Sequence, residues 1–193
     1  MADLALARHA APLIPAATGD RDQPTIPAGR FTLRPLRMSD AGLIAHYTAD
    51  RRLAEGTRAI PHPLPPGAAQ GYVERAMAAG RVEDVWAIDA AASDQCEMVG
   101  VVSLTRLEDE QSELGFWIGA GFWNTGFATE AVQALVAANP HDARTLFAEA
   151  FQDNPGSAKV LTNCGFAYLG DAESWSVARN ARVPTWTYLR RMR

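Results

Sequence analysis

The chain has 193 residues, of which 48% are hydrophobic and 21% charged, and its formal net charge at pH 7 is −4. This length favours one domain with a substantial core, because two domains would each be small. The acidic balance and the lack of a basic stripe argue against nucleic-acid binding, and the lack of about 18 consecutive apolar residues argues against a membrane protein.

The two cysteines, Cys96 and Cys164, form neither a C-x-x-C motif nor a cluster with histidines, so the sequence predicts no metal site and no disulfide framework. Residues 1–29 are rich in alanine and proline, show no sustained hydrophobic period and do not resemble a signal peptide. We therefore expect residues 1–29 to form a flexible N-terminal arm, residues 30–193 to form one domain, and the protein to be cytoplasmic. A monomer and a homodimer both remain open.

The first part of the domain predicts one strand and two helices. Apolar and polar residues alternate in RFTLRPL (30–36), which is typical of a half-buried strand. Ser39 and Asp40 are suitable N-caps for a following helix with apolar residues at helical spacing. The stretch IPHPLPPG (60–67) excludes helix interior, because most of its positions are proline or glycine, and it leads into a second helix at about 68–79.

Three strand signals then follow each other at short intervals. They are VWAIDAA (85–91), MVGVVSLTRL (98–107) and SELGFWIGA (112–120), and polar turns join them. Consecutive strands joined by short turns predict an antiparallel meander.

The pattern changes after residue 120. It predicts a helix at about 127–138, a strand at 145–151 and a second helix at about 155–163, followed by two late strands near 167–177 and 183–191. A strand, a helix and a strand joined by short loops form a crossover, so the strands at 112–120 and 145–151 should be parallel. We expect a mixed α/β (α+β) sheet of about six or seven strands, antiparallel and then parallel at one point, with about four flanking helices.

The segment WNTGFATEA (123–131) precedes the helix at 127–138 and has the features of an anion site. A helix N-terminus exposes unpaired N–H groups and carries a partial positive charge, so it can bind a phosphate. Gly126 lets the backbone approach the anion closely, Ala128 keeps the next position small, and Thr129 adds a hydroxyl donor. The loop also lies at the carboxyl end of a strand where pairing becomes parallel, which is where open α/β sheets bind ligands.

This segment resembles the acyl-CoA pyrophosphate loop of the GNAT N-acetyltransferases, whose pattern is Gln/Arg-x-x-Gly-x-Gly/Ala. ELGFWIGAGFWNTGFATEAV (113–132) followed by DNPGSAKVLTNCGF (153–166) is similar to the branch that includes the ribosomal-protein N-terminal acetyltransferases. The resemblance covers about residues 30–190. Trp123 departs from the wider pattern, because it stands where that pattern has Gln or Arg.

The resemblance implies acetyl-CoA as co-substrate, held between two parallel strands that splay apart. The residues it places around the pyrophosphate are Asn124, Thr125, Gly126, Phe127, Ala128 and Thr129. The strand residues it pairs with the pantetheine arm are Phe116, Trp117 and Ile118. Asn154 and Ser157 would face the pantetheine and the sulfur, although Asn154 is also a suitable N-cap and Ser157 a neutral helix-surface residue.

Acetyl transfer to an amine requires a neutral amine, a donor for the oxyanion and, for the leaving thiolate, a proton. Glu113 and Glu149 are the candidate bases, and each is also compatible with a solvated strand position. A shift of one residue would turn Glu113 to the other face of its strand. Many GNAT enzymes use a tyrosine as the acid, but the corresponding residue here is Leu161, which leaves Ser157 as the candidate acid. A backbone N–H near Ile118 is the expected oxyanion donor.

The acceptor pocket is expected from the first two helices, their connecting loop and the late hairpin. Its polar or aromatic candidates are His46, Tyr47, Arg51, Arg52, His62 and Trp175. Cys164 has no adjacent histidine–acid pair and is interpreted as a buried structural residue rather than a nucleophile.

These features favour direct transfer of an acetyl group to a primary amine in a ternary complex. The acceptor is either a protein N-terminus or a small amine, such as an aminoglycoside, a polyamine or an amino acid. The alternative from another class is a catalytically idle acyl-CoA-binding module, which the missing tyrosine suggests. Another kind of nucleotide-binding protein is disfavoured, since there is no Walker lysine and no complete G-x-G-x-x-G motif.

Overall fold

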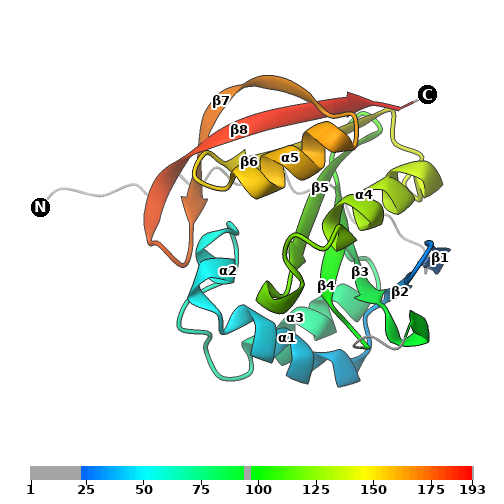
Figure 1. Cartoon of the computed structure of the whole chain (residues 1–193), viewed down its shortest axis with the longest axis vertical. Helices are drawn as coiled ribbons and strands as arrows, with labels where there is room; N and C mark the ends of the chain where they lie inside the picture. The colour runs from blue at the N-terminus through cyan, green and yellow to red at the C-terminus, as the bar shows by residue number, and fades with distance from the viewer. Residues whose placement is uncertain (1–22, 94–96, 193) are drawn as a thin grey trace, which may run out of the picture.

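A single mixed β-sheet organises the computed structural model, which describes residues 23–93 and 97–192 (Figure 1). Its strand order is β1-β2-β3-β4-β5-β6-β8-β7. The strands are β1 (Ile26–Pro27), β2 (Thr32–Pro35), β3 (Glu83–Asp89), β4 (Gly100–Arg106), β5 (Gln111–Ile118), β6 (Thr145–Phe151), β7 (Ala167–Ser176) and β8 (Ala181–Arg191).

Helices cover both faces of this sheet. The α-helices are α1 (Ala41–Thr48), α2 (Arg51–Glu55), α3 (Ala68–Met77), α4 (Phe127–Ala138) and α5 (Pro155–Asn163). Short 3₁₀ turns are η1 (Met38–Asp40), η2 (Ala91–Ser93) and η3 (Ala120–Phe122). None of the helices in the described ranges is long and apolar enough to cross a membrane.

Two hydrophobic clusters lie on opposite faces of the sheet. The first packs α4 and α5 against the sheet and contains Leu135, Leu146 and Leu161. The second packs α1–α3 against the other face and contains Val73 and Trp117. The alternation of strand side chains therefore decides which cluster a residue joins. Residues of β5 and β6 that point toward α1–α3 form the floor of the site described below.

The crossover predicted from the sequence is present. Strand β5 pairs with β4 in antiparallel and with β6 in parallel orientation. The parallel pairing runs only from Gln111 opposite Thr145 to Leu114 opposite Ala148. Beyond this point β5 stays with β4 and β6 stays with β8, so the two strands separate toward their carboxyl ends. The splayed pair expected from the family resemblance is thus a feature of this sheet.

The expected number of elements was too low. The described residues contain eight strands, not six or seven, and five α-helices, not four. The additional strand β1 has only two residues, which is too short for a periodic signal. The additional helix α2 starts because Asp50 is extended and its side chain accepts a hydrogen bond from the Arg52 N–H, which separates α2 from α1.

The N-terminal segment is partly described. Strand β1 lies within residues 1–29, the range predicted as an arm, and pairs with β2. Residues 1–22 lie outside the described residues. The division of the chain at residue 29 stays a prediction.

Candidate active site

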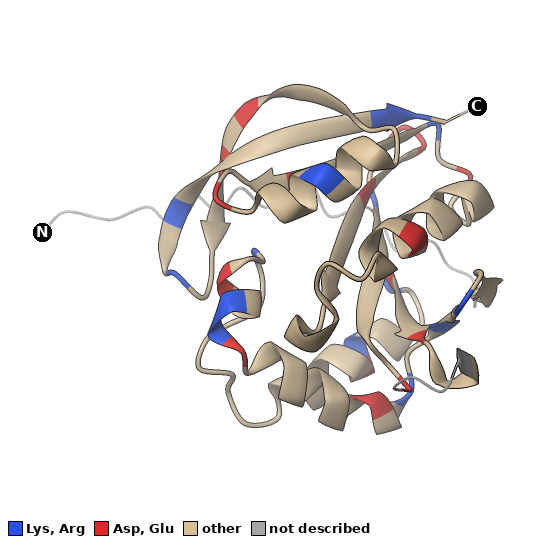
Figure 2. Cartoon of the chain, in the orientation of Figure 1, with Lys and Arg blue, Asp and Glu red and all other residues tan. Residues whose placement is uncertain are grey.

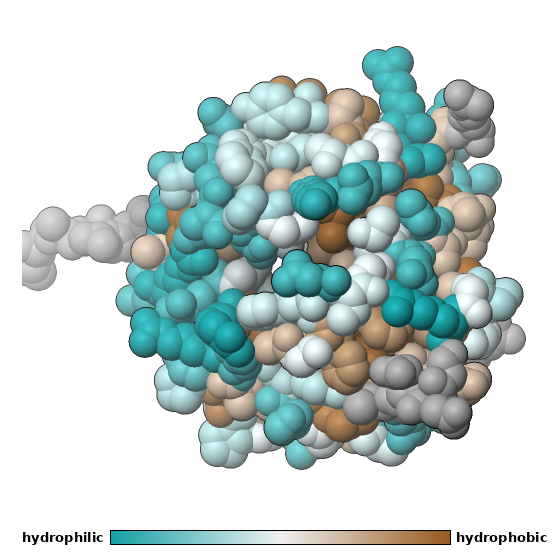
Figure 3. Space-filling view, in the orientation of Figure 1, coloured by the Kyte–Doolittle hydropathy of each residue, from teal (hydrophilic) through white to brown (hydrophobic). Residues whose placement is uncertain are grey.

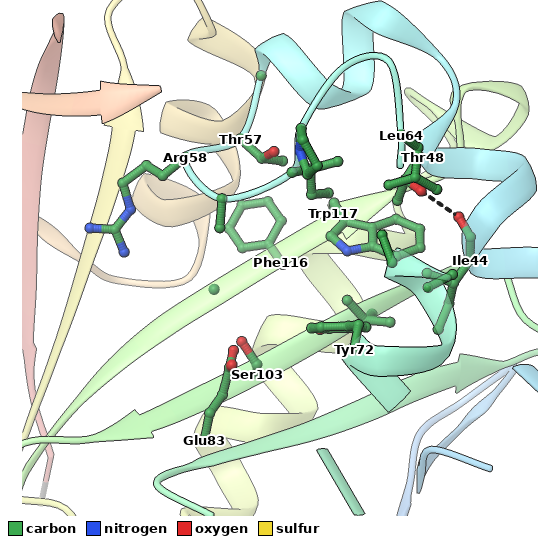
Figure 4. Close-up of a pocket in the computed structure, with 18 of the residues that line it drawn as sticks. Ile44, Thr48, Thr57, Arg58, Leu64, Tyr72, Glu83, Ser103, Phe116 and Trp117 are labelled. Atoms are coloured by element: carbon green, nitrogen blue, oxygen red, sulfur yellow. Dashed lines mark hydrogen bonds between the residues drawn. The ribbon is translucent and has the colours of Figure 1, made fainter. Parts of the chain in front are cut away.

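A cavity of about 830 Å³ opens where β5 and β6 separate (Figure 4). Its walls come from α1, α3 and the loop between α2 and α3, and its floor comes from β4, β5 and β6. Figure 4 shows Tyr72, Phe116 and Trp117 in the central part of this space. Glu83 and Ser103 lie side by side at one end, whereas Arg58 extends away from this group. The cavity therefore combines an apolar middle with charged ends.

The loop before α4 has the backbone conformation of an anion cradle. Gly126 is the N-cap of α4, its φ is +88°, and no side chain caps this end of the helix. Asn124 is also left-handed, with φ of 61°. Alternation of left-handed and right-handed residues turns successive N–H groups toward one side and produces a concavity that binds anions. The residues present therefore fit a diphosphate.

Arg30, which belongs to no motif in the sequence, holds this loop through its side chain. Its Nε donates to Glu130 Oε2 at 2.9 Å and its Nη2 donates to the Thr125 carbonyl at 2.6 Å. Its guanidinium also lies 3.9 Å from the centre of the Phe127 ring. Arg30 precedes β2 and is about a hundred residues from the loop in sequence, so no local pattern could have indicated the contact.

Trp123 connects the loop to the end of β5. Its indole N–H donates to the Ile118 carbonyl at 2.7 Å, and Arg52 lies 5.2 Å from its ring. The residue that replaces Gln or Arg of the wider pattern therefore ties the anion loop to the splayed strand. Arg52 brings a second cation to this side.

Charge on this face of the molecule is distributed around the separated strands. Figure 2 shows cationic positions on α2 and on α5, in line with Arg51, Arg52 and Lys159 in these helices. In the filled surface, hydrophilic residues prevail over α2 and the β7–β8 hairpin, on the left of the view (Figure 3). Arg51 and Arg52 form ion pairs with Glu55 and Asp50, so α2 carries both signs of charge, and Lys159 is the cation on α5.

The predicted cofactor residues are brought together, but with different exposure. Asn124, Thr125 and Gly126 are exposed, and Ala128 and Thr129 are half-buried. The Phe127 side chain is 3% exposed and packs in the core against Phe31, so only its backbone N–H can face a phosphate.

The predicted β5 residues also differ among themselves. Trp117 and Ile118 are buried, and Phe116 is half-buried. Phe116 and Trp117 both line the cavity.

Asn154 and Ser157 lie where α5 begins beside the cavity. The Asn154 side-chain oxygen accepts from the Ser157 N–H at 3.2 Å, so Asn154 is a true N-cap. Its Nδ2 donates to the Gly56 carbonyl at 3.5 Å, which is a long bond. Ser157 is half-buried and lines the cavity, whereas Leu161 is fully buried in the core.

Glu113 and Glu149 face the same cavity. Glu113 is opposite Phe147 in the parallel register, and Glu149 lies two residues further along β6, so both point to the α1–α3 side of the sheet. Arg58 forms ion pairs with both, contacting Glu113 through Nη2 and Glu149 through Nη1 at 3.1 Å. The Ser174 hydroxyl donates to Glu149 at 2.6 Å. The two candidate bases are therefore joined by one guanidinium.

None of the six side chains expected in the acceptor pocket lines the cavity. They are His46, Tyr47, Arg51, Arg52, His62 and Trp175. Tyr47, for example, turns toward the sheet and donates its hydroxyl to the Met98 carbonyl at 2.9 Å. The residues of α1, the α2–α3 loop and α3 that do line the cavity include Thr48, Arg58 and Tyr72, and the location of the acceptor pocket stays a prediction. Burial raises the pKa of Tyr72.

A hydroxyl of the cavity wall is unsatisfied in the described part of the chain. Thr185 of β8 lines the cavity, is fully buried, and its hydroxyl has no hydrogen-bond partner within the described residues.

Cys164 is buried at the end of α5, where desolvation raises the pKa of its thiol to about 11, despite the opposing charge of Arg190. Such a thiol is a poor nucleophile. In the ranges that the structure covers, no three His, Cys, Asp or Glu side chains group as a metal site.

A parallel strand pair that parts beside a glycine-led helix N-terminus is the architecture of an N-acetyltransferase. The chain belongs to the GNAT family, since residues 30–167 match the family model of the acetyltransferase (GNAT) domain. A curated relative, the uncharacterized N-acetyltransferase p20 of Bacillus licheniformis, is 20% identical over 168 residues, which is 85% of this chain and 94% of that protein.

Solved structures share the fold. A ribosomal L7/L12 α-N-protein acetyltransferase in complex with coenzyme A superposes with a TM-score of 0.75 at 18% identity, covering 88% of this chain and 98% of the other. Spermidine N-acetyltransferase from Vibrio cholerae, in complex with coenzyme A and spermine, gives a TM-score of 0.67 at 16% identity over 83% and 95% of the two chains. Enzymes with protein and with polyamine acceptors thus have this architecture.

Proposed function

We propose that the protein transfers the acetyl group of acetyl-CoA directly to a primary amine bound in the cavity between β5 and β6. The observation that carries this proposal is the position of Gly126, whose left-handed backbone opens α4 beside the splayed strands. Asn124, Thr125, Gly126, Phe127, Ala128 and Thr129 would bind the diphosphate, mainly through backbone N–H groups. The edge of β5 at Phe116–Ile118 would pair with the pantetheine arm as an added strand does.

The cavity side supplies the acid–base groups. Acetyl-CoA supplies a thioester, whose carbonyl carbon is attacked by the amine nitrogen while its C–S bond breaks. Glu113 or Glu149 would accept the proton that the ammonium must lose. A backbone N–H of β5 near Ile118 would bind the oxyanion. Ser157 would give a proton to the leaving thiolate and take up the second proton, which the nitrogen loses as the amide forms, and Asn154 would hold the start of α5 in place.

Direct transfer is favoured over an acetylated enzyme because no cysteine is among the described residues that line the cavity. The thiol of Cys164 is buried and of high pKa. Positioning of amine and thioester in one complex can supply much of the rate. The acceptor is an amine of a protein N-terminus or of a small molecule.

One experiment tests this function and separates the glutamates. Thiol release from acetyl-CoA is followed with a panel of peptides and small amines, for the wild type and for Glu113→Gln and Glu149→Gln. Loss of the base should reduce kcat/KM about 10²- to 10⁴-fold. Glu173→Gln on the exposed β7 strand is the matched control and should leave kcat/KM unchanged.

A second candidate, an idle acyl-CoA-binding module, is favoured by one observation, the fully buried Leu161 in place of an acidic tyrosine. It predicts tight binding of acetyl-CoA with no thiol release for any amine. Turnover with any acceptor above the hydrolysis rate would exclude it.

A further inference from the structure

The charges in the cavity alternate in sign. Glu113 of β5, Arg58 of the α2–α3 loop and Glu149 of β6 form one linked row of ion pairs. The two carboxylates are 24% and 20% exposed, and the guanidinium is 46% exposed, so all three remain accessible from the cavity. Two negative groups and one positive group leave a net charge of about −1 for a ligand to neutralise.

Backbone contacts hold the loop that carries Arg58. The Arg58 carbonyl accepts from the Val177 N–H at 2.9 Å, and the Glu55 carbonyl accepts from Arg179 Nε at 2.9 Å. Arg179 is fixed in turn by Asp153, at 2.5 Å between Nη1 and Oδ2. The α2–α3 loop is therefore fastened to the turn between β7 and β8. Arg58 is a held side chain at the cavity, not a freely moving surface arginine.

The guanidinium has donors to spare. Arginine offers five N–H donors, and the described residues take up two of them through Glu113 and Glu149. A guanidinium donates to carbonyl and carboxylate oxygens but repels a cation. A row of negative, positive and negative charge is thus complementary to a ligand with a protonated nitrogen next to a hydrogen-bond-accepting oxygen.

We propose that Arg58 determines acceptor specificity by binding an oxygen of the acceptor that lies next to its reactive amine. This role rests on the proposed acetyl transfer. The amine meets Glu113 or Glu149, and the oxygen of the same group meets Arg58. An amine followed by a carbonyl, as in an amino-acid amide or a peptide N-terminus, satisfies both contacts. A polyamine brings only positive charges, and Arg58 opposes the second of them.

The test compares two amines that differ only in this oxygen-bearing group, alaninamide and isopropylamine. Arg58→Met removes the donors and keeps much of the side-chain length. We expect kcat/KM for alaninamide to fall about 10- to 100-fold, as for a lost hydrogen bond to a charged group, while the value for isopropylamine changes little. Each amine is compared with itself, so their different basicities cancel. Arg182→Met, an exposed cation outside the cavity lining, is the control.

An equal loss for both amines would overturn the proposal, because Arg58 would then act only through the glutamates. Calorimetric binding of alaninamide to the CoA-loaded protein separates this inference from the proposed function. Weaker binding to Arg58→Met would support the specificity role even if the wild type released no thiol, in which case the proposed transfer alone fails. Equal binding to both proteins would overturn the role of Arg58. Arg58→Leu, which also lacks N–H donors, serves if the methionine variant does not fold.

Discussion

Gly126→Ala tests the proposed anion site at the residue whose backbone conformation is least compatible with a side chain. Gly126 has φ of +88° at the N-cap of α4, a conformation that L-residues rarely adopt. A Cβ built there would lie 3.3 Å from Arg30 Nη2 and 3.5 Å from Glu130 Oε1. Both atoms end flexible side chains that can move by a few tenths of an ångström. The cost of the substitution therefore comes from the backbone and not from a steric clash.

The magnitude follows from two responses of the loop. If alanine keeps the left-handed conformation, the fold loses about 1–2 kcal/mol of stability. If the loop relaxes to negative φ instead, the N–H groups turn away from the ligand, and each lost hydrogen bond to a phosphate costs about 1.5–3 kcal/mol. One such bond corresponds to a reduction in coenzyme A affinity of about 10- to 100-fold.

Calorimetric titration with coenzyme A and urea unfolding of the same samples measure both responses. Gly121→Ala is the matched control in η3, because a Cβ there meets no atom within 4 Å and Gly121 is not among the glycines with positive φ. We expect Gly121→Ala to keep the wild-type affinity. Wild-type affinity together with wild-type stability in Gly126→Ala would contradict both responses and refute the assignment of the α4 N-terminus as the diphosphate site.

Three further predictions concern residues around the site and in the fold. Desolvation raises the pKa of Asp84, but its hydrogen bond with His141 and the charge of Arg81 outweigh this and lower the pKa below its usual value. The stability that Asp84 contributes is therefore present above the unfolded pKa and lost as pH falls through the lower folded pKa. Asp84→Asn should reduce the urea midpoint at pH 7 and flatten the decline of that midpoint below about pH 4. Thr185→Val removes a buried hydroxyl that has no hydrogen-bond partner among the described residues and should leave the urea midpoint unchanged or higher, whereas a loss above about 1 kcal/mol would show that the hydroxyl is bonded. Arg30→Met should weaken coenzyme A binding about 10-fold in calorimetry, and unchanged affinity would show that the loop needs no anchor.

Much of the fold could be predicted from the sequence where local signals were strong. The approximate bounds predicted for α4 and α5 and the range predicted for β6 agree with the structure, because glycine, asparagine and proline mark their ends and apolar periods fill them. The parallel pair followed from the short loops of this crossover. The two-residue strand β1 and the five-residue helix α2 give no period and were not predicted.

The side of the sheet on which Glu113 lies is decided by strand pairing and not by the local sequence pattern. From the sequence alone, a shift by one residue would have turned this side chain into the core. Strand β4 fixes the register, because Thr105 pairs with Glu113 and Ser103 with Gly115. The cavity side then follows from alternation. The contacts of Arg58 and Arg30 depend on such tertiary placement, so no local pattern indicates them.

Trp123 positions the loop before α4 through a hydrogen bond to β5. A side chain of Gln or Arg at this position could donate directly to an anion, and Trp123 instead donates its indole N–H to the Ile118 carbonyl. The anion loop is thereby tied to the strand whose free edge faces the gap. Positive charge comes from elsewhere, since Arg30 reaches the loop from the N-terminal side of β2. Trp123 therefore fixes the position of the loop, and Arg30, far away in sequence, brings the positive charge. A change at either residue should affect the proposed cofactor site without altering the acceptor cavity.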